Sequence, residues 1–334
     1  MKNRMHPEVL IIGAGNIAQG FDSPDATSVR THIKGYRHYA PFFNVQAFFD
    51  IDADKAHDAA ETWSVPFFSS DFSEIESRRF DVVSICTPDS THGYYLEKVL
   101  AMQPKVIFLE KPLGISASQA HEVFRYCNDN QILLLLNYSR LYINEFNTLR
   151  KQIQSPDFGD ILSVSIKYHK GFFHNCSHFI SLVLFLIDPV YCSAAVTGVI
   201  NDYEGDPSWS ALVSFEGQKG KFRMNIEAYD QAVIHFIEVD IIGSNRRVIY
   251  RESMGAQVTE YKKLGYFDGM FLQEFVEDKN YRIDYNLAMI NAVDVIRKYL
   301  TGVEKPDAFY QPLFVNTVAI MENIAQSGLS NQFI

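Results

Sequence analysis

The sequence predicts an α/β domain with a parallel sheet, followed by an α+β domain built on a mostly antiparallel open sheet. In the first half of the chain, apolar runs of strand length alternate with amphipathic stretches, a pattern typical of strand–helix–strand units. In the second half the runs alternate in polarity, and one pair is joined by the tight turn "EGQKG", which favours hairpins. The chain has 334 residues, enough for two domains of about 100 to 200 residues each.

Five short apolar runs are the expected strands of the first sheet. They are residues 9–12, 45–49, 82–86, 106–109 and 132–136. Several are continuously apolar, as expected for strands buried on both faces. Between them, "ADKAHDAAETW", "HGYYLEKVLAM" and "SASQAHEVFRYCN" are the expected helices, and the last begins with Ser116 and Gln119 in capping-box spacing.

The second half begins with an expected connecting helix, "NEFNTLRKQI". The expected strands are "ILSVSIKYHK", "WSALVSFEG", "GKFRMNIEAY", "VIHFIEVDIIG" and "RRVIYRE". The helix "AMINAVDVIRKYL" follows, and a last helix around "VNTVAIMENIAQSG" is expected to pack back towards the N-terminal domain. We therefore expect a first domain over residues 1–137 and a second over residues 138–334.

Composition excludes several classes of partner. The formal net charge is -10 and no block of Lys and Arg appears, which disfavours nucleic acid because phosphate binding needs clustered cations. The longest later apolar run, residues 179–187, is far short of the roughly 20 residues of a membrane span. Cys86, Cys127, Cys176 and Cys192 form no CxxC pair, which fits a reducing compartment. We expect a cytoplasmic protein without a nucleic-acid or membrane partner.

The stretch "VLIIGAGNIAQGFD" predicts a dinucleotide site. Directly after a strand, Gly13 permits a tight turn, Gly15 lets the backbone approach a pyrophosphate, and the small Ala18 lets the next helix pack closely. The phosphates would then lie at the helix N-terminus, beside Asn16 and Ile17. The alternative is an ordinary strand–helix turn, because GxGxxA alone is weak evidence.

Asp50 supports the dinucleotide interpretation. It ends the second expected strand, where a carboxylate accepts hydrogen bonds from the adenosine ribose hydroxyls. No Arg follows in "DIDADKA" to neutralise a 2'-phosphate, so NAD is expected rather than NADP. Asp50 lies 35 residues after Gly15 because residues 21–43 intervene, either as a segment near the cofactor or as a surface insertion without function.

Two adjoining motifs carry a resemblance to a known family. "VVSICTPDSTHGYYLEKVL" followed by "KVIFLEKPLG" resembles the paired signature of the Gfo/Idh/MocA family of NAD(P)-dependent sugar and polyol dehydrogenases. The resemblance continues through "NYSRLY", "GDILSVSIKYHKG", "HNCSHFIS" and the closing helix. It implies hydride transfer between a nicotinamide and a secondary hydroxyl or keto carbon of a sugar, nucleotide sugar or polyol. It also implies a homodimer or homotetramer formed through the C-terminal sheet.

"EKP" is the most specific of these motifs. Glu110, Lys111 and Pro112 follow a central strand, at the edge where open parallel sheets bind ligands, and the proline keeps Lys111 out of helical geometry. The resemblance implies that Lys111 is catalytic, binds substrate and, with Glu110, contributes to the cofactor site. The alternative for Lys111 is a solvated residue at a strand end.

Other site residues are implied by the same resemblance. Thr87, Pro88 and His92 should line the dinucleotide near the nicotinamide ribose, although Pro88 could simply end its strand and His92 begin a helix. Tyr138 and Arg140, after the last strand of the first domain, should bind substrate, and the alternative for Arg140 is an ion pair between the domains.

"HNCSHFIS" holds the second cluster. If this stretch is helical, His174 and His178 lie on one face, and a zinc pair or a packed structural pair are alternatives to catalysis. The resemblance implies that His178 is the catalytic base and that Asn175 contacts substrate. The family often has Asp where this chain has His174, and some members have Asp where it has Ser181. We therefore expect His174 to assist His178, and no metal. The missing carboxylate also leaves a non-catalytic NAD(P)-binding regulator as the alternative function.

Overall fold

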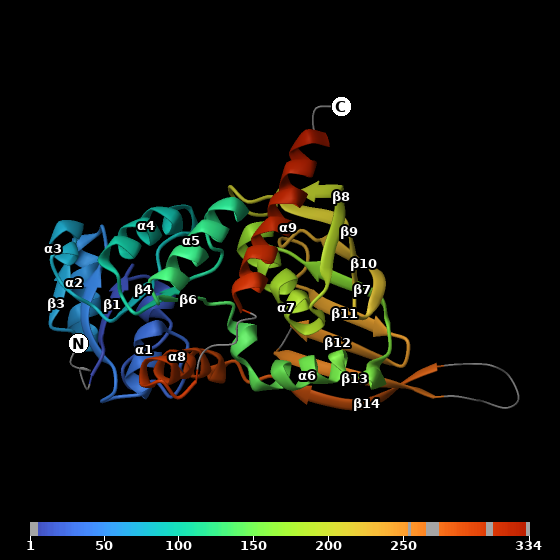
Figure 1. Ribbon diagram of the computed structural model, residues 1–334, viewed down its shortest axis with the longest axis horizontal. Helices are drawn as coiled ribbons and strands as arrows, with labels where there is room; N and C mark the ends of the chain where they lie inside the picture. The colour runs from blue at the N-terminus through green and yellow to red at the C-terminus, as the bar shows by residue number, and fades with distance from the viewer. Residues whose placement is uncertain (1–5, 253–254, 265–273, 305–309, 332–334) are drawn as a thin grey trace, which may run out of the picture. The chain divides into compact units, whose positions relative to one another are not determined.

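The computed structural model describes residues 6–252, 255–264, 274–304 and 310–331. The chain divides into two compact units (Figure 1). Unit 1 comprises Met1–Tyr142 and Tyr285–Val315, and unit 2 comprises Ile143–Asp284 and Asn316–Ile334. The sequence places the division at residues 137 and 138, and it does not assign Tyr285–Val315 to the first unit.

Unit 1 is built on a six-stranded parallel sheet in the order β3-β2-β1-β4-β5-β6. The strands are β1 (Glu8–Ile12), β2 (Asn44–Phe49), β3 (Phe67–Ser69), β4 (Val82–Ile85), β5 (Val106–Leu109) and β6 (Leu133–Leu136). The expected parallel sheet is confirmed. The sequence missed β3, because three residues are too few to show a period.

The helices of unit 1 surround this sheet. They are α1 (His32–His38), α2 (Ala53–Trp63), α3 (Phe72–Glu76), α4 (His92–Met102), α5 (Ala117–Asp129) and α8 (Asn286–Thr301), with short helical turns η1 (Asn16–Gly20), η2 (Asp89–Thr91) and η3 (Ser139–Tyr142). The expected capping box of Ser116 and Gln119 is present at α5. Helices α1 and α8 approach closely at Gly35, where an added Cβ would lie 2.8 Å from Met289 Cγ.

Unit 2 is built on an eight-stranded sheet in the order β14-β13-β12-β11-β7-β10-β9-β8, in which only the β7–β10 pair is parallel. The strands are β7 (Ile161–Tyr168), β8 (Val190–Ile200), β9 (Ser208–Gly217), β10 (Gly220–Ala228), β11 (Ile237–Gly243), β12 (Arg246–Glu252), β13 (Ala256–Leu264) and β14 (Glu274–Arg282). The mostly antiparallel sheet is confirmed. The sequence missed β8, β13 and β14. The two edge strands, β8 and β14, carry few fully buried side chains.

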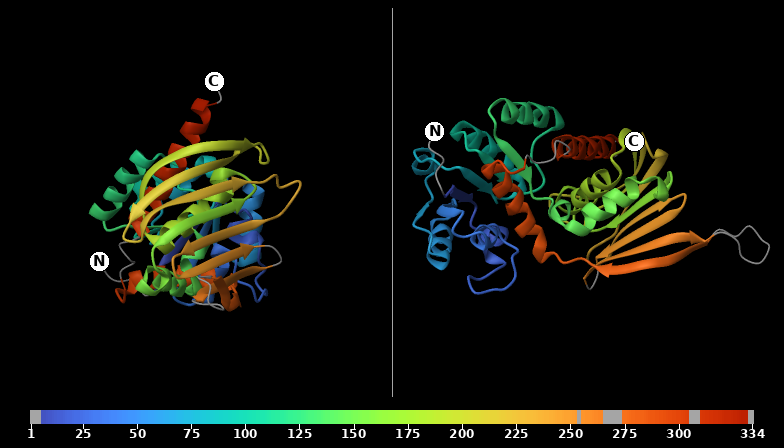
Figure 2. Two further views of the ribbon diagram at one scale, coloured as in Figure 1. Left: turned by 90° about the vertical axis from the view of Figure 1, so that its right-hand side faces the viewer. Right: turned by 60° about the horizontal axis from the view of Figure 1, so that its bottom comes forward.

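Helices cover one face of this sheet. Helices α6 (Asn144–Gln154) and α7 (Ser177–Ile187) belong to unit 2, with the turns η4 (Pro156–Phe158) and η5 (Phe172–Cys176). Helix α9 (Tyr310–Asn331) has its first turns in unit 1, where Phe314 stacks on Tyr138. From Asn316 onward it belongs to unit 2. The opposite face of the sheet lies towards the viewer in Figure 2, left, with no helix in front of it.

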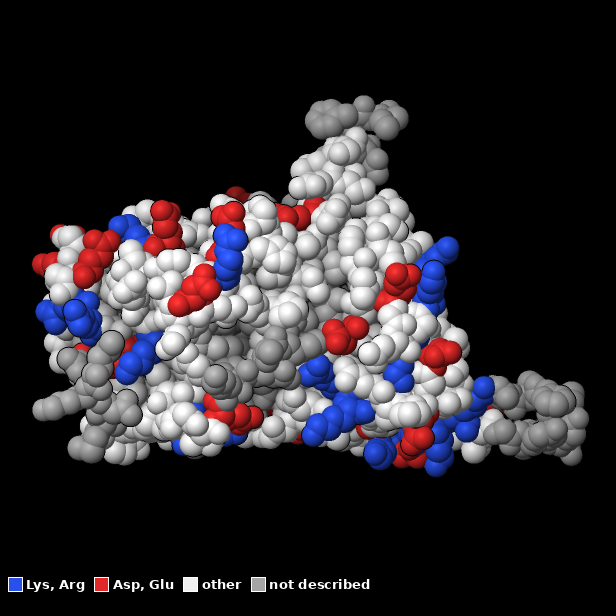
Figure 3. All heavy atoms as spheres, viewed as in Figure 1, with Lys and Arg blue, Asp and Glu red and all other residues white. Residues whose placement is uncertain are grey.

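Within the described residues, no helix is both long enough and apolar enough to span a membrane. On the face shown in Figure 3, acidic and basic side chains are interspersed. Charged side chains also pair across strands of unit 2, for example Asp278 with Arg246 at 3.2 Å and with Lys262 at 2.9 Å.

Candidate active site

The turn after β1 has the geometry that the glycine motif predicts. Gly13 has φ +89°, and an added Cβ would lie 2.7 Å from the carbonyl oxygen of Cys86. Its amide donates to Phe49 O at 2.7 Å, which ties the turn to β2. Ala18, in the following turn η1, is fully buried. Gly13 is therefore required by the protein itself.

Gly15 differs from Gly13 in what surrounds it. Its φ is -77°, which any residue adopts, and no atom lies within 4 Å of an added Cβ. Neither the backbone nor a neighbouring side chain demands glycine here. Gly15 and Asn16 are exposed and Ile17 is half-buried. An open backbone at the start of η1 fits the approach of a pyrophosphate.

Two alanine substitutions test this difference. Gly13→Ala should destabilise the protein by about 1–3 kcal/mol because it forces a strained φ. Gly15→Ala should leave the melting temperature unchanged and weaken NADH binding by about tenfold or more. Calorimetry and NADH fluorescence titration measure the two effects. Equal NADH affinity for Gly15→Ala and the unmodified protein would place the dinucleotide elsewhere.

Asp50 lies at the carboxyl end of β2 beside the glycine turn. Its Oδ2 accepts from the amide of Ala14 at 2.8 Å, and its Oδ1 accepts from the amide of Asp52 at 3.0 Å. A carboxylate has about four acceptor positions, so the side chain is fixed in place and still has lone pairs for ribose hydroxyls.

The loops after β4 and β5 are joined by His92. Its ring is fully buried, with Nδ1 2.6 Å from Pro112 O and Nε2 2.9 Å from Thr87 O. Thr87 Oγ1 is buried and has no hydrogen-bond partner among the described residues, while Pro88 is exposed. His92 therefore links two loops at the edge where cofactors bind, and Thr87 holds an unused polar atom there.

Glu110 is the centre of a buried polar cluster. Its Oε1 accepts from His32 Nε2 at 2.9 Å and from Asn137 Nδ2 at 2.6 Å. His32 Nδ1 lies 3.0 Å from Ser84 Oγ, which lies 2.8 Å from the hydroxyl of Tyr36. Burial raises the pKa of the Glu110 carboxyl, but His32, Asn137 and the charge of Lys111 outweigh this and leave that pKa below its usual value. Glu110 is thus a carboxylate inside the protein.

The segment over residues 21–43, whose role the sequence left open, supplies His32 and Tyr36. Asp22 organises it, because its carboxylate accepts from the amides of Arg30 and Thr31, both at 2.8 Å, and from the hydroxyl of Ser28. Burial raises the pKa of Asp22, and these hydrogen bonds lower it below the usual value. The segment is therefore an ordered support for the buried cluster. Sequence reasoning missed His32; an isolated His before a short helix gives little signal.

Lys111 is half-buried. Tyr138 and Arg140, expected to bind substrate, are 2% and 6% exposed. Tyr138 stacks on Phe314, with ring centroids 6.0 Å apart, and the Arg140 guanidinium lies 5.6 Å from the centre of the Tyr285 ring. Both side chains pack inside unit 1 in this structure, and their role in substrate binding stays a prediction.

In unit 2, the two histidines lie in different elements. His174 is in the π-helical turn η5 and His178 is in the first turn of α7, so one regular helix does not carry both. His178 is the one residue of α7 that is not buried. His174 stacks on Tyr203, with centroids 4.8 Å apart, and Asn175 Nδ2 donates to His169 O at 2.8 Å. Ser181 is buried, and its hydroxyl donates to His178 O.

Asp206 is a neighbour that sequence reasoning missed. Its carboxylate accepts from the amide of Phe173 at 3.0 Å and from that of His174 at 2.7 Å. Gly171 makes room for it, since an added Cβ there would lie 2.4 Å from Asp206 Oδ2. Burial raises the pKa of Asp206 above its usual value, despite these hydrogen bonds. The connection between β8 and β9 thus supplies a carboxylate beside His174. No local sequence motif predicts this contact.

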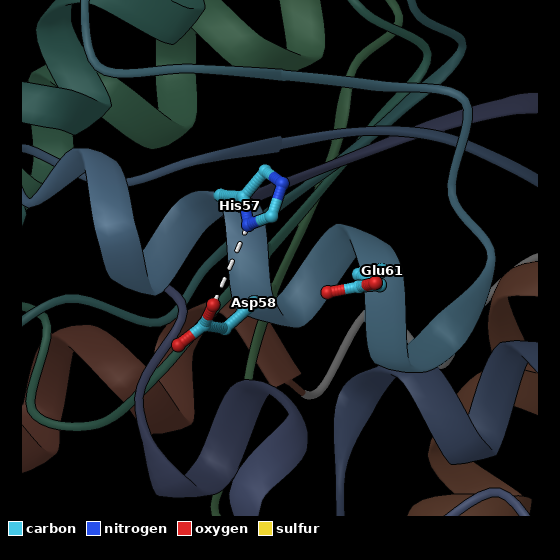
Figure 4. Close-up of side chains that lie close together, drawn as sticks. All are labelled: His57, Asp58 and Glu61. Atoms are coloured by element: carbon cyan, nitrogen blue, oxygen red, sulfur yellow. Dashed lines mark hydrogen bonds and ion pairs between the residues drawn. The ribbon is translucent and has the colours of Figure 1, made fainter.

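A cluster of potential metal ligands lies on α2, away from His174 and His178 in the sequence. Among the described residues, one group of three or more candidate side chains lies close together: His57, Asp58 and Glu61 on α2 (Figure 4). All three are exposed, and His57 Nδ1 lies 3.4 Å from Asp58 Oδ1. Exposed groups of this kind are common on helix surfaces, and we assign no metal to them.

Comparison with known proteins finds a family match in the first part of the chain. Residues 8–138 match the model of the GFO_IDH_MocA oxidoreductase family, described as an NAD-binding Rossmann fold. This confirms the resemblance drawn from the motifs and the expectation of an NAD cofactor.

Relatives extend the likeness over the chain. Inositol 2-dehydrogenase of Rhizobium meliloti (strain 1021) is 26% identical over 201 residues, which are 55% of this chain and 58% of that protein. The matched part thus spans less than two thirds of this relative. A putative NADPH-dependent oxidoreductase of Desulfitobacterium hafniense DCB-2 superposes with a TM-score of 0.75 at 12% identity, covering 99% of this chain and 97% of the other. The WlbA dehydrogenase of Chromobacterium violaceum, in complex with NADH and UDP-GlcNAcA, gives 0.73 at 14% identity, with coverage of 98% and 95%. These structures show the fold.

Proposed function

We propose that the chain is an NAD-dependent dehydrogenase acting on a secondary hydroxyl or keto carbon of a sugar, nucleotide sugar or polyol. The observation that carries the proposal is Lys111, half-buried at the carboxyl end of β5 and preceded by the ionised, buried Glu110. A cation held on a rigid strand end suits stabilisation of a developing alkoxide. The substrate class is supported by relatives that are named as acting on inositol or bound to a nucleotide sugar.

The residues of unit 1 fit a dinucleotide. Gly13, Gly15, Asn16 and Ile17 would hold the pyrophosphate, and Asp50 the adenosine ribose. Thr87, with its unused buried hydroxyl oxygen, would bind near the nicotinamide, together with Pro88, Glu110 and Lys111. His92 would position these residues through its contacts with Thr87 O and Pro112 O. When bound, the nicotinamide supplies the hydride acceptor or donor.

The chain's own residues then handle the substrate oxygen and its proton. Lys111 would donate a hydrogen bond to the reacting oxygen, and a ring nitrogen of His178 would take the hydroxyl proton. His174, with Asp206 beside it, would orient His178 or pass its proton outward. Asn175, Tyr138 and Arg140 would bind further substrate groups.

The cofactor should be NAD rather than NADP. Asp50 would repel a 2'-phosphate. The one cation in "DIDADKA" is Lys55, whose Nζ pairs with Asp52 Oδ2 at 3.5 Å. We expect NADH to bind at least about tenfold more tightly than NADPH, a difference of about 1.4 kcal/mol. Fluorescence titration with each measures this. Equal affinities would remove Asp50 from the ribose site.

A homodimer or homotetramer would form through the open face of the unit 2 sheet. That face carries a row of charged side chains in which Glu238 pairs with Lys167 at 2.9 Å and with Arg251 at 2.6 Å. A face of this kind can pair with its own copy. The compartment would be the cytoplasm, in keeping with four unpaired cysteines.

The test is NADH formation with a panel of sugars, sugar acids, nucleotide sugars and polyols. Turnover on one class identifies the substrate. If NADH binds but no member of the panel is oxidised or its ketone reduced, the chain is instead an NAD(P)-binding regulator of the same fold.

A further inference from the structure

Two fully buried imidazoles contact the residues on either side of Lys111. His32 contacts Glu110, the residue before the lysine, and His92 contacts the carbonyl of Pro112, the residue after it. Both rings are 0% exposed. Among the described residues, His92 bonds to backbone carbonyls alone, whereas His32 bonds to a charged side chain. Loss of His32 would therefore change the electrostatics at Lys111.

His32 donates a hydrogen bond to Glu110. The Glu110 carboxylate only accepts, so His32 Nε2 must donate to it. On the other side of the ring, Nδ1 lies 3.0 Å from the Ser84 hydroxyl, which lies 2.8 Å from the Tyr36 hydroxyl. Tyr36 is 0% exposed, so these hydrogen bonds lie inside the protein.

We propose that His32 is a positioning residue for Lys111, acting through Glu110. His32 and Asn137 keep Glu110 ionised and fixed, and its negative charge attracts the neighbouring Lys111 ammonium at the end of β5. The segment over residues 21–43 is thereby part of the active site's support. The effect on turnover rests on the proposed function, whereas the effect on Glu110 does not.

Three other titratable side chains of this buried region carry no charge. Burial raises the pKa of the Tyr36, Cys86 and Tyr142 side chains, which stay neutral. The charge of Lys111 is among the causes that lower the pKa of Glu110, so the two side chains interact electrostatically.

Two substitutions separate the two sides of the ring. His32→Gln keeps a donor at the reach of Nε2 and so keeps the bond to Glu110. His32→Asn keeps a polar atom near the position of Nδ1, beside Ser84, and loses the donor to Glu110. The matched controls are His38→Gln and His38→Asn, on the exposed side of the same helix.

We expect kcat for His32→Asn to fall about tenfold or more below that of His32→Gln, the cost of one charge-assisted hydrogen bond. KM and NADH affinity should change by less than about threefold, since Lys111 acts mainly on the transition state. Both His38 variants should match the unmodified enzyme. Equal kcat values for the two His32 variants would overturn the proposal.

A second readout does not need turnover. Because the pKa of Glu110 is lowered, the stability it contributes is present above the unfolded value of 4.5 and is lost as the pH falls through its folded value. The difference in melting temperature between His32→Gln and His32→Asn should therefore be larger at about pH 6 than at about pH 3. A difference that is the same at both pH values would show a packing role alone and would overturn the proposal. If this readout succeeds while the unmodified chain oxidises nothing, the dehydrogenase function fails and the support of Lys111 stands.

Discussion

Lys111→Met should lower kcat by about a hundredfold or more and leave NADH affinity nearly unchanged. The substitution keeps an unbranched side chain that is one atom shorter and removes its charge, so the loss measures mainly one preorganised charged donor in the transition state. Steady-state kinetics on the identified substrate and NADH titration measure the two quantities.

Lys105→Met is the matched control for this prediction. Lys105 precedes β5 at its other end and pairs with Asp81 at 3.0 Å, so its loss should leave kcat within about twofold because exposed ion pairs contribute little. If Lys111→Met keeps its rate, the lysine is structural and the most specific motif of the family has no catalytic role here.

His178→Asn should also lower kcat by about a hundredfold or more, because a general base contributes roughly that much. Oxidation by the unmodified enzyme should slow as the pH falls and the base gains a proton. His174→Asp should retain substantial activity with this acid limb displaced, since the substitution changes the charge beside the base.

Profiles of kcat/KM between about pH 5 and pH 9 test both variants, with His121→Asn on the exposed side of α5 as the control. An active His178→Asn enzyme with an unchanged profile would show that the proton leaves by another route. Activity lost to a chelator and restored by zinc would support the metal interpretation instead.

The parallel sheet and the resemblance of residues 8–138 to the Gfo/Idh/MocA family could be predicted from the sequence. Four of the five apolar runs form the inner strands β2, β1, β4 and β5, and the fifth forms the edge strand β6, whose residues are nevertheless mostly buried. Strands buried on both faces are continuously apolar, so their hydrophobicity marks them in the sequence. The helix bounds of α2 and α4 agree with the predicted stretches residue for residue. The turn at Gly13 could be predicted because it depends on adjacent residues. Lys111 lies at a strand end as the sequence indicates, and its role stays a prediction.

The tertiary structure alone decided which distant groups support those motifs. The contact between His32 and Glu110 joins residues 78 positions apart, and Asp206 reaches His174 across 32. No local period encodes such pairs. The same limit explains the missed strands, since β8 and β14 are edge strands whose side chains are mostly exposed, and their pairing depends on neighbouring strands rather than on their own hydrophobicity. Gly13 and Gly15 illustrate this difference within one motif, because the sequence alone does not distinguish them. The surrounding atoms show that the fold requires glycine at Gly13, whereas the space around Gly15 is open.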